Sequence, residues 1–188
     1  MSEELMVREA SPTLAGIKTG SLFSCPYSSH EEMMEDIRQI NRSMVKKGLC
    51  LLPLQFREDR VLLYLFRPAS LEHDLTDREA IRILEKAGYE HRGYRRCLTE
   101  LVRRVKSCGP GSFPHEIGLF LSYPPEDVRG FIENHAEGSK LTGCWKVYGD
   151  VRAARRRFDA FQRCTAAYRR QLAAGKSVYQ LAVDGERI

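Results

Sequence analysis

The sequence predicts a single α+β domain in which helices cover at least one face of a small, mainly antiparallel or mixed sheet of about four strands. Two apolar segments joined by a polar turn indicate a β-hairpin within residues 49–66, and several other segments carry apolar residues at helical intervals. Strands and helices do not alternate strictly enough for a doubly wound sheet. We expect the domain over residues 28–188, with residues 1–27 as an irregular segment packed on it.

The first half of the chain contains a helix followed by the hairpin. Prolines and glycines interrupt residues 1–27, which favours irregular backbone there. Serines and glutamates at capping-box spacing then begin a helix over residues 28–48, whose apolar residues recur every three or four positions. Residues 49–56 and 61–66 are the two hairpin strands. Pro53 has no backbone N–H to donate, so the first strand should lie at an edge or contain a bulge.

In the second half, two helices are followed by a strand, a helix and a last strand. Capping residues and apolar faces predict helices over residues 76–88 and 94–105, and a glycine follows each. The apolar run 117–122 is expected to be a strand, and the pair Pro124-Pro125 should open a further helix. Residues 144–148 form the last strand candidate, because their side chains alternate in character.

The last helix is long, amphipathic and basic. It is expected over residues 150–174, with Asp150 as its N-cap, and a short element at 177–183 follows, more typical of helix than strand. Residues 150–174 hold seven arginines and two acids, which accounts for the whole formal net charge of +5. One exposed stripe of this helix consists of Arg152, Arg156, Arg163 and Arg170. It is either a solvated face or a surface for phosphates or an acidic protein. Nucleic acid is disfavoured, because no aromatic residues interleave on that face.

Composition excludes several protein classes. Hydrophobic residues make up 43% of the chain and charged residues 29%, values typical of globular domains rather than disordered, collagen-like or membrane-channel sequences. The acidic N-terminus has no apolar signal region, so a cytoplasmic location is expected. The six cysteines are scattered without a CxxC pair, which favours free thiols over disulfides or a metal site.

Few residues indicate chemistry. His115 and Glu116, at the entrance of the expected strand at 117–122, are candidates for acid–base catalysis, and His115 is also a possible metal ligand. On a regular strand only one of them would face a given pocket. The structural alternatives are that His115 makes a structural hydrogen bond and that Glu116 is a solvated or capping acid. Cys108 lies seven residues before His115, so a thiolate–base pair is conceivable, whereas Cys164 lies near the apolar line of the last helix. Signatures of zinc proteases, α/β-hydrolases, P-loop proteins and dinucleotide-binding folds are absent.

Three motifs resemble a bacterial family known as domain of unknown function 3793. They are PTLAGIK, FPHEIGLFLSYPPEDVRGFI and GCWKVYGD, and the resemblance runs from Pro12 to about Val183. Ser122 stands where the family usually has glycine, and Cys144 where tyrosine is common. The resemblance implies a soluble bacterial protein of unestablished activity, in an iron- or flavodoxin-linked redox context.

The resemblance also nominates polar residues for a common pocket. Carried onto this sequence, its pattern includes Lys18, His115, Glu116, Tyr123, Lys146 and Tyr148, with separate surface positions as the alternative. We expect a binding or accessory protein for a small ligand, a metal or an acidic redox partner, and the sequence specifies no cofactor. The alternatives are an enzyme with a His115/Glu116 pocket for a small anionic substrate, and nucleic-acid binding through the arginine-rich helix.

Overall fold

The computed structural model describes residues 1–90, 93–109 and 112–185. The chain folds into two compact units, one made of Met1–Ser70 with Phe161–Ile188 and the other of Leu71–Ala160. Helices α3 (Pro68–Asp74) and α8 (Val151–Ala173) contain the points at which the chain passes between them. The α+β class is confirmed, and the sheets are antiparallel throughout the described residues.

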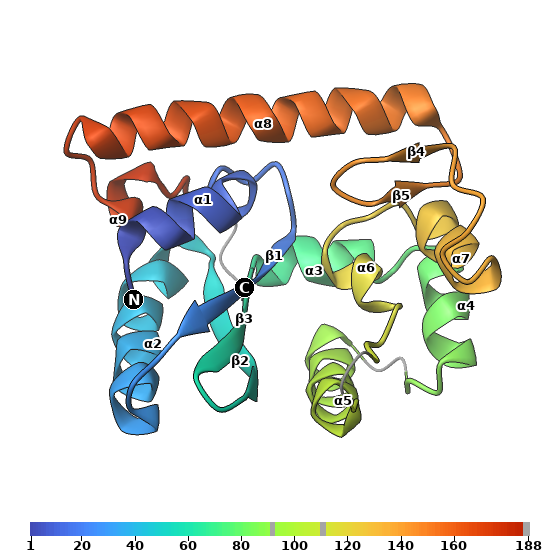
Figure 1. The fold of residues 1–188 in the computed structure, drawn as a ribbon, viewed down its shortest axis with the longest axis horizontal. Helices are drawn as coiled ribbons and strands as arrows, with labels where there is room; N and C mark the ends of the chain where they lie inside the picture. Colours follow the sequence, from blue (N-terminus) through green and yellow to red (C-terminus); the bar gives the residue numbers. More distant parts are fainter. Residues whose placement is uncertain (91–92, 110–111, 186–188) are drawn as a thin grey trace. The chain divides into compact units, whose positions relative to one another are not determined.

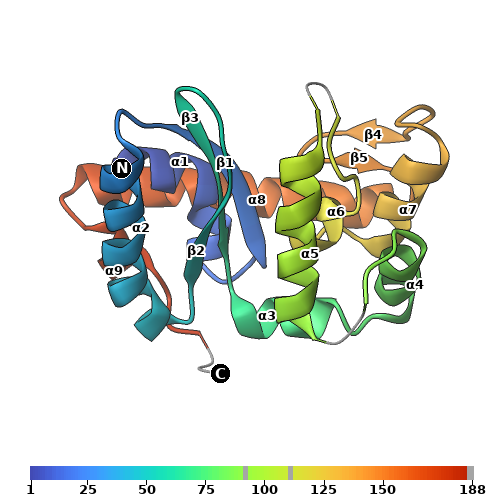
Figure 2. The same cartoon turned by 90° about the horizontal axis from the view of Figure 1, so that it is seen from below.

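The first unit is built on a three-stranded sheet. Strands β1 (Gly20–Pro26), β2 (Cys50–Phe56) and β3 (Arg60–Phe66) pair in the order β1-β3-β2 (Figures 1 and 2). The expected hairpin is therefore confirmed as β2–β3. Strand β2 lies at an edge, and its register shifts between Pro53 and Gln55, as the missing N–H of a proline requires.

Residues 1–27 are not irregular, and that prediction was wrong. Helix α1 (Glu3–Leu14) precedes β1, and the Ser2 hydroxyl caps it by accepting from the Leu5 N–H at 3.2 Å. Pro12 lies in the last turn, where one missing N–H does little harm. The buried face of α1 continues past Pro12 to Leu14, and this proline concealed the helix in the sequence.

Three helices cover one face of the sheet. They are α1, α2 (His30–Met44, continued by the 3-10 turn η1 at Val45–Lys47) and α9 (Val178–Leu181). Their apolar residues join alternate residues of the strands in one core, which includes Val7, Phe23, Ile37, Leu63 and Val178. The helical assignments of residues 28–48 and 177–183 are thus confirmed, with slightly shorter helices than expected.

A buried arginine ties this unit together. Arg67, 4% exposed, follows β3 and donates to four backbone carbonyls. Two belong to the end of α1, Thr13 at 2.8 Å and Leu14 at 2.7 Å. The others are Lys47 after α2 at 3.3 Å and Val183 after α9 at 2.9 Å. These four contacts involve carbonyl groups and no carboxylate. The carbonyl dipoles near the helix ends therefore offset the cost of burying the Arg67 charge.

The second unit is mainly helical. Its elements are the end of α3, α4 (Arg78–Lys86), α5 (Tyr94–Ser107), α6 (Ile117–Phe120), α7 (Pro125–Glu133), β4 (Leu141–Thr142), β5 (Lys146–Val147) and the first turns of α8. The predicted helices at 76–88, 94–105 and after Pro124 are confirmed, and the Asp77 side chain caps α4. Figure 1 shows the small β4–β5 hairpin beside α7 and the start of α8.

One strand prediction fails in this unit, and the other is confirmed with shorter bounds. Residues 117–122 form helix α6 and a turn instead of a strand, because a short, fully buried apolar run has no period that separates helix from strand. The last strand shortens to Lys146–Val147 and pairs with β4, which was not predicted, so the described chain has five strands rather than four. Ser122 has φ +57°, a backbone conformation that favours glycine over residues with a side chain.

Helix α8 confirms the long helix predicted at residues 150–174. Asp150 caps it, since its Oδ1 accepts from the N–H groups of Arg152 at 2.8 Å and Ala153 at 3.0 Å. No helix among the described residues is long and apolar enough to cross a membrane.

Candidate functional site

The run from Phe113 to Ile132 folds into turns and two helices of the second unit. His115 and Glu116 lie in a helical turn before α6, so the strand rule that would separate their directions does not apply. His115 is exposed and Glu116 is buried, yet both border the same cavity. Tyr123 and Pro124 then lead into α7.

Asp127 joins this run to the motif at 143–150. The carboxylate is 3% exposed, and its Oδ1 accepts from the backbone N–H groups of Tyr148 and Gly149, each at 2.7 Å. Its Oδ2 accepts from the Trp145 indole N–H at 2.7 Å. Three N–H donors thereby replace the water that the buried carboxylate loses. Asp127 is therefore a structural residue that positions β5.

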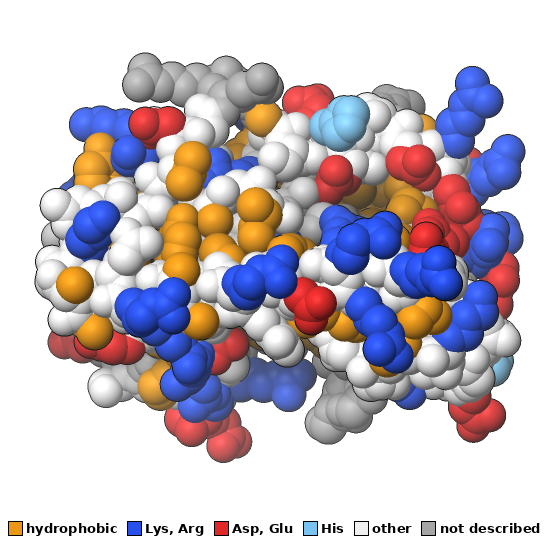
Figure 3. Space-filling model, turned by 90° about the horizontal axis from the view of Figure 1, so that it is seen from above, with side chains coloured by type: hydrophobic (Ala, Val, Ile, Leu, Met, Phe, Trp, Pro, Cys, Tyr) orange, Lys and Arg blue, Asp and Glu red, His pale blue; other side chains and the backbone are white. Residues whose placement is uncertain are grey.

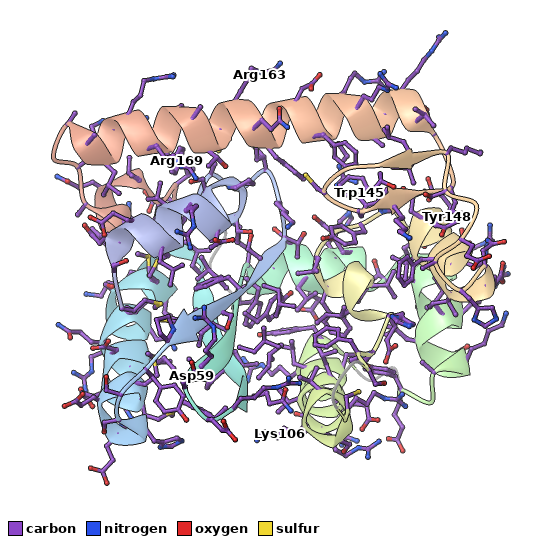
Figure 4. The ribbon with its side chains drawn as sticks, in the orientation of Figure 1. Asp59, Lys106, Trp145, Tyr148, Arg163 and Arg169 are labelled. Carbon is purple, nitrogen blue, oxygen red and sulfur yellow. The ribbon has the colours of Figure 1, made fainter. Side chains whose placement is uncertain are left out.

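Close packing explains further motif residues. A Cβ on Gly118 of α6 would stand 2.7 Å from Val128 Cγ2, and a Cβ on Gly130 of α7 would overlap the Tyr148 ring. The short helices can approach their neighbours only with glycine at these positions. Figure 4 shows Trp145 and Tyr148 at the two ends of β5, with Tyr148 near α7.

Three of the predicted site residues border one small cavity. His115, Tyr123 and Lys146 come from three segments and line a cavity of about 320 Å³, which we call the aromatic cavity. Its other walls are mainly apolar and include Phe113, Phe131 and Trp145. The His115 and Phe131 rings meet edge to face at 5.0 Å, and Tyr123 stacks on Trp145 at 4.9 Å.

The polar side chains of the aromatic cavity differ in the hydrogen bonds that they make within the protein. The Lys146 ammonium group donates to the Ala136 carbonyl at 2.6 Å and has two further hydrogens. The Tyr123 hydroxyl donates to the Cys144 carbonyl at 3.2 Å, and burial raises the pKa of Tyr123 to about 12. The His115 ring makes no hydrogen bond with a described residue. His115 and Lys146 therefore have donors to offer a ligand.

A larger cavity of about 710 Å³ adjoins the aromatic cavity, and His115 and Phe113 line both. Helices α4 and α7 and residues 112–116 form its walls, and we call it the charged cavity. Glu116 lies in its wall but is committed elsewhere. It accepts from the Tyr89 hydroxyl at 3.0 Å and pairs with Arg104 Nη1 at 3.6 Å. Burial, followed by the charge of Glu116, raises the pKa of Tyr89, so this tyrosine keeps its proton.

Other predicted residues lie outside these cavities. Lys18 belongs to the first unit, where its ammonium group stands 5.9 Å from the Phe161 ring centroid. The Tyr148 ring packs on α7, and its buried hydroxyl has no hydrogen-bond partner among the described residues. A common pocket for all the nominated residues stays a prediction, whereas the cavity shared by His115, Tyr123 and Lys146 is present.

The six cysteines form no disulfide within the part of the chain that the structure describes. Burial raises the pKa of the Cys164 thiol, which disfavours the nucleophilic thiolate at neutral pH. Cys108 caps the end of α5 and lines neither cavity. Within residues 1–90, 93–109 and 112–185 no group of three or more metal-ligating side chains includes His115.

The predicted arginine stripe is exposed along α8. Figure 3 shows basic side chains on the face that carries this helix, with acidic ones among them, and Arg163 points outward from α8 in Figure 4. All four members are exposed: Arg152, Arg156, Arg163 and Arg170. Arg157 instead stands over the Trp145 ring at 5.6 Å. Binding of an acidic partner or nucleic acid by this stripe stays a prediction.

Some residues that line the cavities were not predicted from the sequence. Phe113 and Phe131 flank the motif and were not separable from ordinary core aromatics. Arg82 and Lys86 of α4 border the charged cavity, but their spacing of four residues is equally typical of a solvated helix face.

Comparisons with known proteins agree with the resemblance seen in the motifs. Searches of the curated proteins and of the solved structures each returned no significant match. A family model matches residues 6–182, and this chain therefore belongs to the family described as protein of unknown function (DUF3793).

Proposed function

We propose that the protein binds a small molecule with a flat aromatic ring, which lies in the aromatic cavity. The observation that carries this proposal is that one cavity of about 320 Å³ gathers His115, Tyr123 and Lys146 among aromatic walls. Ligand sites are typically apolar cavities with a few convergent polar groups. Aromatic walls favour a planar ring, because rings gain from stacked and edge-to-face contacts.

Binding is a better account of this geometry than acid–base catalysis by a His115–Glu116 pair. The Glu116 carboxylate is already engaged by Tyr89 and Arg104, so it has little freedom to exchange protons with a substrate. His115 and Lys146 keep hydrogen-bond donors at the cavity, where they would orient a ligand through its polar substituents.

Trp145 provides a built-in reporter, since it is the only tryptophan in the chain and lines the cavity. The probe is 4-nitrobenzyl alcohol, a neutral nitroaromatic compound that quenches indole fluorescence on contact. Titration should quench the emission of Trp145 saturably, and calorimetry should yield the same dissociation constant.

Variants locate the binding. His115→Ala should weaken binding about three- to tenfold, equivalent to about 1 kcal/mol of ring contact. His73→Ala is the matched control, because His73 is also an exposed histidine of the second unit and does not line the aromatic cavity. Unsaturable quenching, or equal affinity in both variants and the original protein, would contradict the proposal.

A further inference from the structure

Two cations of the charged cavity are not committed to its acids. Three acids and three arginine or lysine side chains line this cavity, and all three acids are already in ion pairs, two of them with the same arginine. Glu79 and Glu133 pair with Arg129, the latter at 3.7 Å, and Glu116 pairs with Arg104. Among the described residues, Arg82 and Lys86 are cations of this wall with no ion-pair partner.

These two cations are arranged for a common ligand. They are four residues apart on α4, so their side chains leave the same side of the helix on successive turns. Like charges at this spacing repel each other, and an anion between them would relieve the repulsion. Glu79, which lies three residues before Arg82 on the same helix, is held by Arg129 instead.

His115 connects this cation pair to the aromatic cavity. Its ring borders both cavities, and Phe113 does so as well. A molecule with its ring against Phe131 and Trp145 would therefore have His115 beside it, and His115 also lines the charged cavity.

From this arrangement we infer that the ligand is an aromatic compound with a phosphate or carboxylate group, which Arg82 and Lys86 bind in the charged cavity. The inference rests on the proposed function, because it assigns the ring of the same ligand to the aromatic cavity. Arginine and lysine are the usual partners of such oxyanions, arginine through its planar fork and lysine as a point charge.

The test compares two probes that share one ring. 4-Nitrobenzyl alcohol and 4-nitrobenzyl phosphate are titrated against the full chain, with Trp145 quenching as the readout. The phosphate ester should bind about tenfold tighter than the alcohol, and this ratio should fall as salt is raised. Arg82→Ala/Lys86→Ala should bring the ratio close to one and leave the affinity for the alcohol unchanged.

Arg78→Ala is the control for a lost charge, since Arg78 is an exposed arginine of the same helix that does not line the cavity. Circular dichroism shows whether each variant folds. If the alcohol binds but the ester gains nothing, or if the gain survives in the double variant, the anionic subsite is wrong and the aromatic site stands. If neither probe quenches Trp145 saturably, both proposals are wrong.

Discussion

Replacing Arg67 by methionine tests whether one buried cation holds the first unit together. Methionine keeps the length of the apolar stem but removes all the donors of the guanidinium group. The end of α1 would lose the bonds to the Thr13 and Leu14 carbonyls, and the segments after α2 and α9 would lose those to Lys47 and Val183.

The magnitude follows from which bonds water can replace. The contacts with Lys47 and Val183 are partly exposed, so water can take over and we count them as zero. Those with Thr13 and Leu14 are buried and charge-assisted, worth about 1.5 kcal/mol each. Both carbonyls keep one backbone donor, from Gly16 at 3.2 Å and Val183 at 3.0 Å, which limits the penalty. We therefore expect Arg67→Met to cost about 3 kcal/mol.

Urea unfolding followed by circular dichroism at 222 nm measures this cost. Arg67→Lys should lose about half as much, because an ammonium group has three donors but cannot span four carbonyls. The control is Arg60→Met, which removes an exposed arginine of the same sheet bonded to Ser24 and should cost less than about 1 kcal/mol. A loss in Arg67→Met no larger than that of the control would refute the reasoning.

Three further predictions concern the second unit. Asp127→Ala should cost about 1–3 kcal/mol in urea unfolding, because the buried indole N–H of Trp145 loses its acceptor, while water can reach the partly exposed N–H groups of Tyr148 and Gly149; an unchanged midpoint would contradict this. Gly130→Ala should lower the free energy of unfolding by about 1–3 kcal/mol through overlap with the Tyr148 ring, and unaltered stability would show that the ring can move. Hydrogen bonding to Arg103 lowers the pKa of Glu100 from 4.5 to about 2, so its stabilisation is present above the ordinary pKa and is lost as the pH falls from there towards 2. Thermal melts at pH 5 and pH 2.5 should therefore differ less in Glu100→Gln than in the original protein, and equal differences would exclude this contribution.

Local patterns predicted most elements because local physics decides them. Pro53 predicted an edge strand because proline has no backbone N–H to donate. Asp150 predicted a helix start because its carboxylate can accept hydrogen bonds from the first N–H groups of the helix. The errors fall where tertiary packing decides. The run at 117–122 is buried on all sides, so its backbone state depends on Val128 and other neighbours remote in sequence. Helix α1 was hidden by Pro12, whose cost depends on its position within a turn.

Some features of the candidate site could likewise be predicted from the sequence, whereas others depend on tertiary packing. His115 was recognisable as a histidine beside a carboxylate, and Lys146 was indicated by the resemblance to the family. Their common cavity was not, since it depends on α7 and on the hairpin that Asp127 positions. Arg82 and Lys86 carry no local signal at all, because only the ion pairs of the neighbouring acids reveal that these two cations lack partners.

Asp127 and His115 belong to one motif, yet the contacts separate their roles. Both carboxylate oxygens of Asp127 accept hydrogen bonds within the fold. Loss of this side chain should therefore release β5, and should disturb the aromatic cavity only because the fold becomes less stable. His115 is exposed and makes a single ring contact, so its loss should leave stability intact and change binding directly. Membership of the motif therefore does not show whether a residue is needed for the fold or for binding. The hydrogen bonds that each side chain has already made inside the fold distinguish the residues that build this site from those left to meet a ligand.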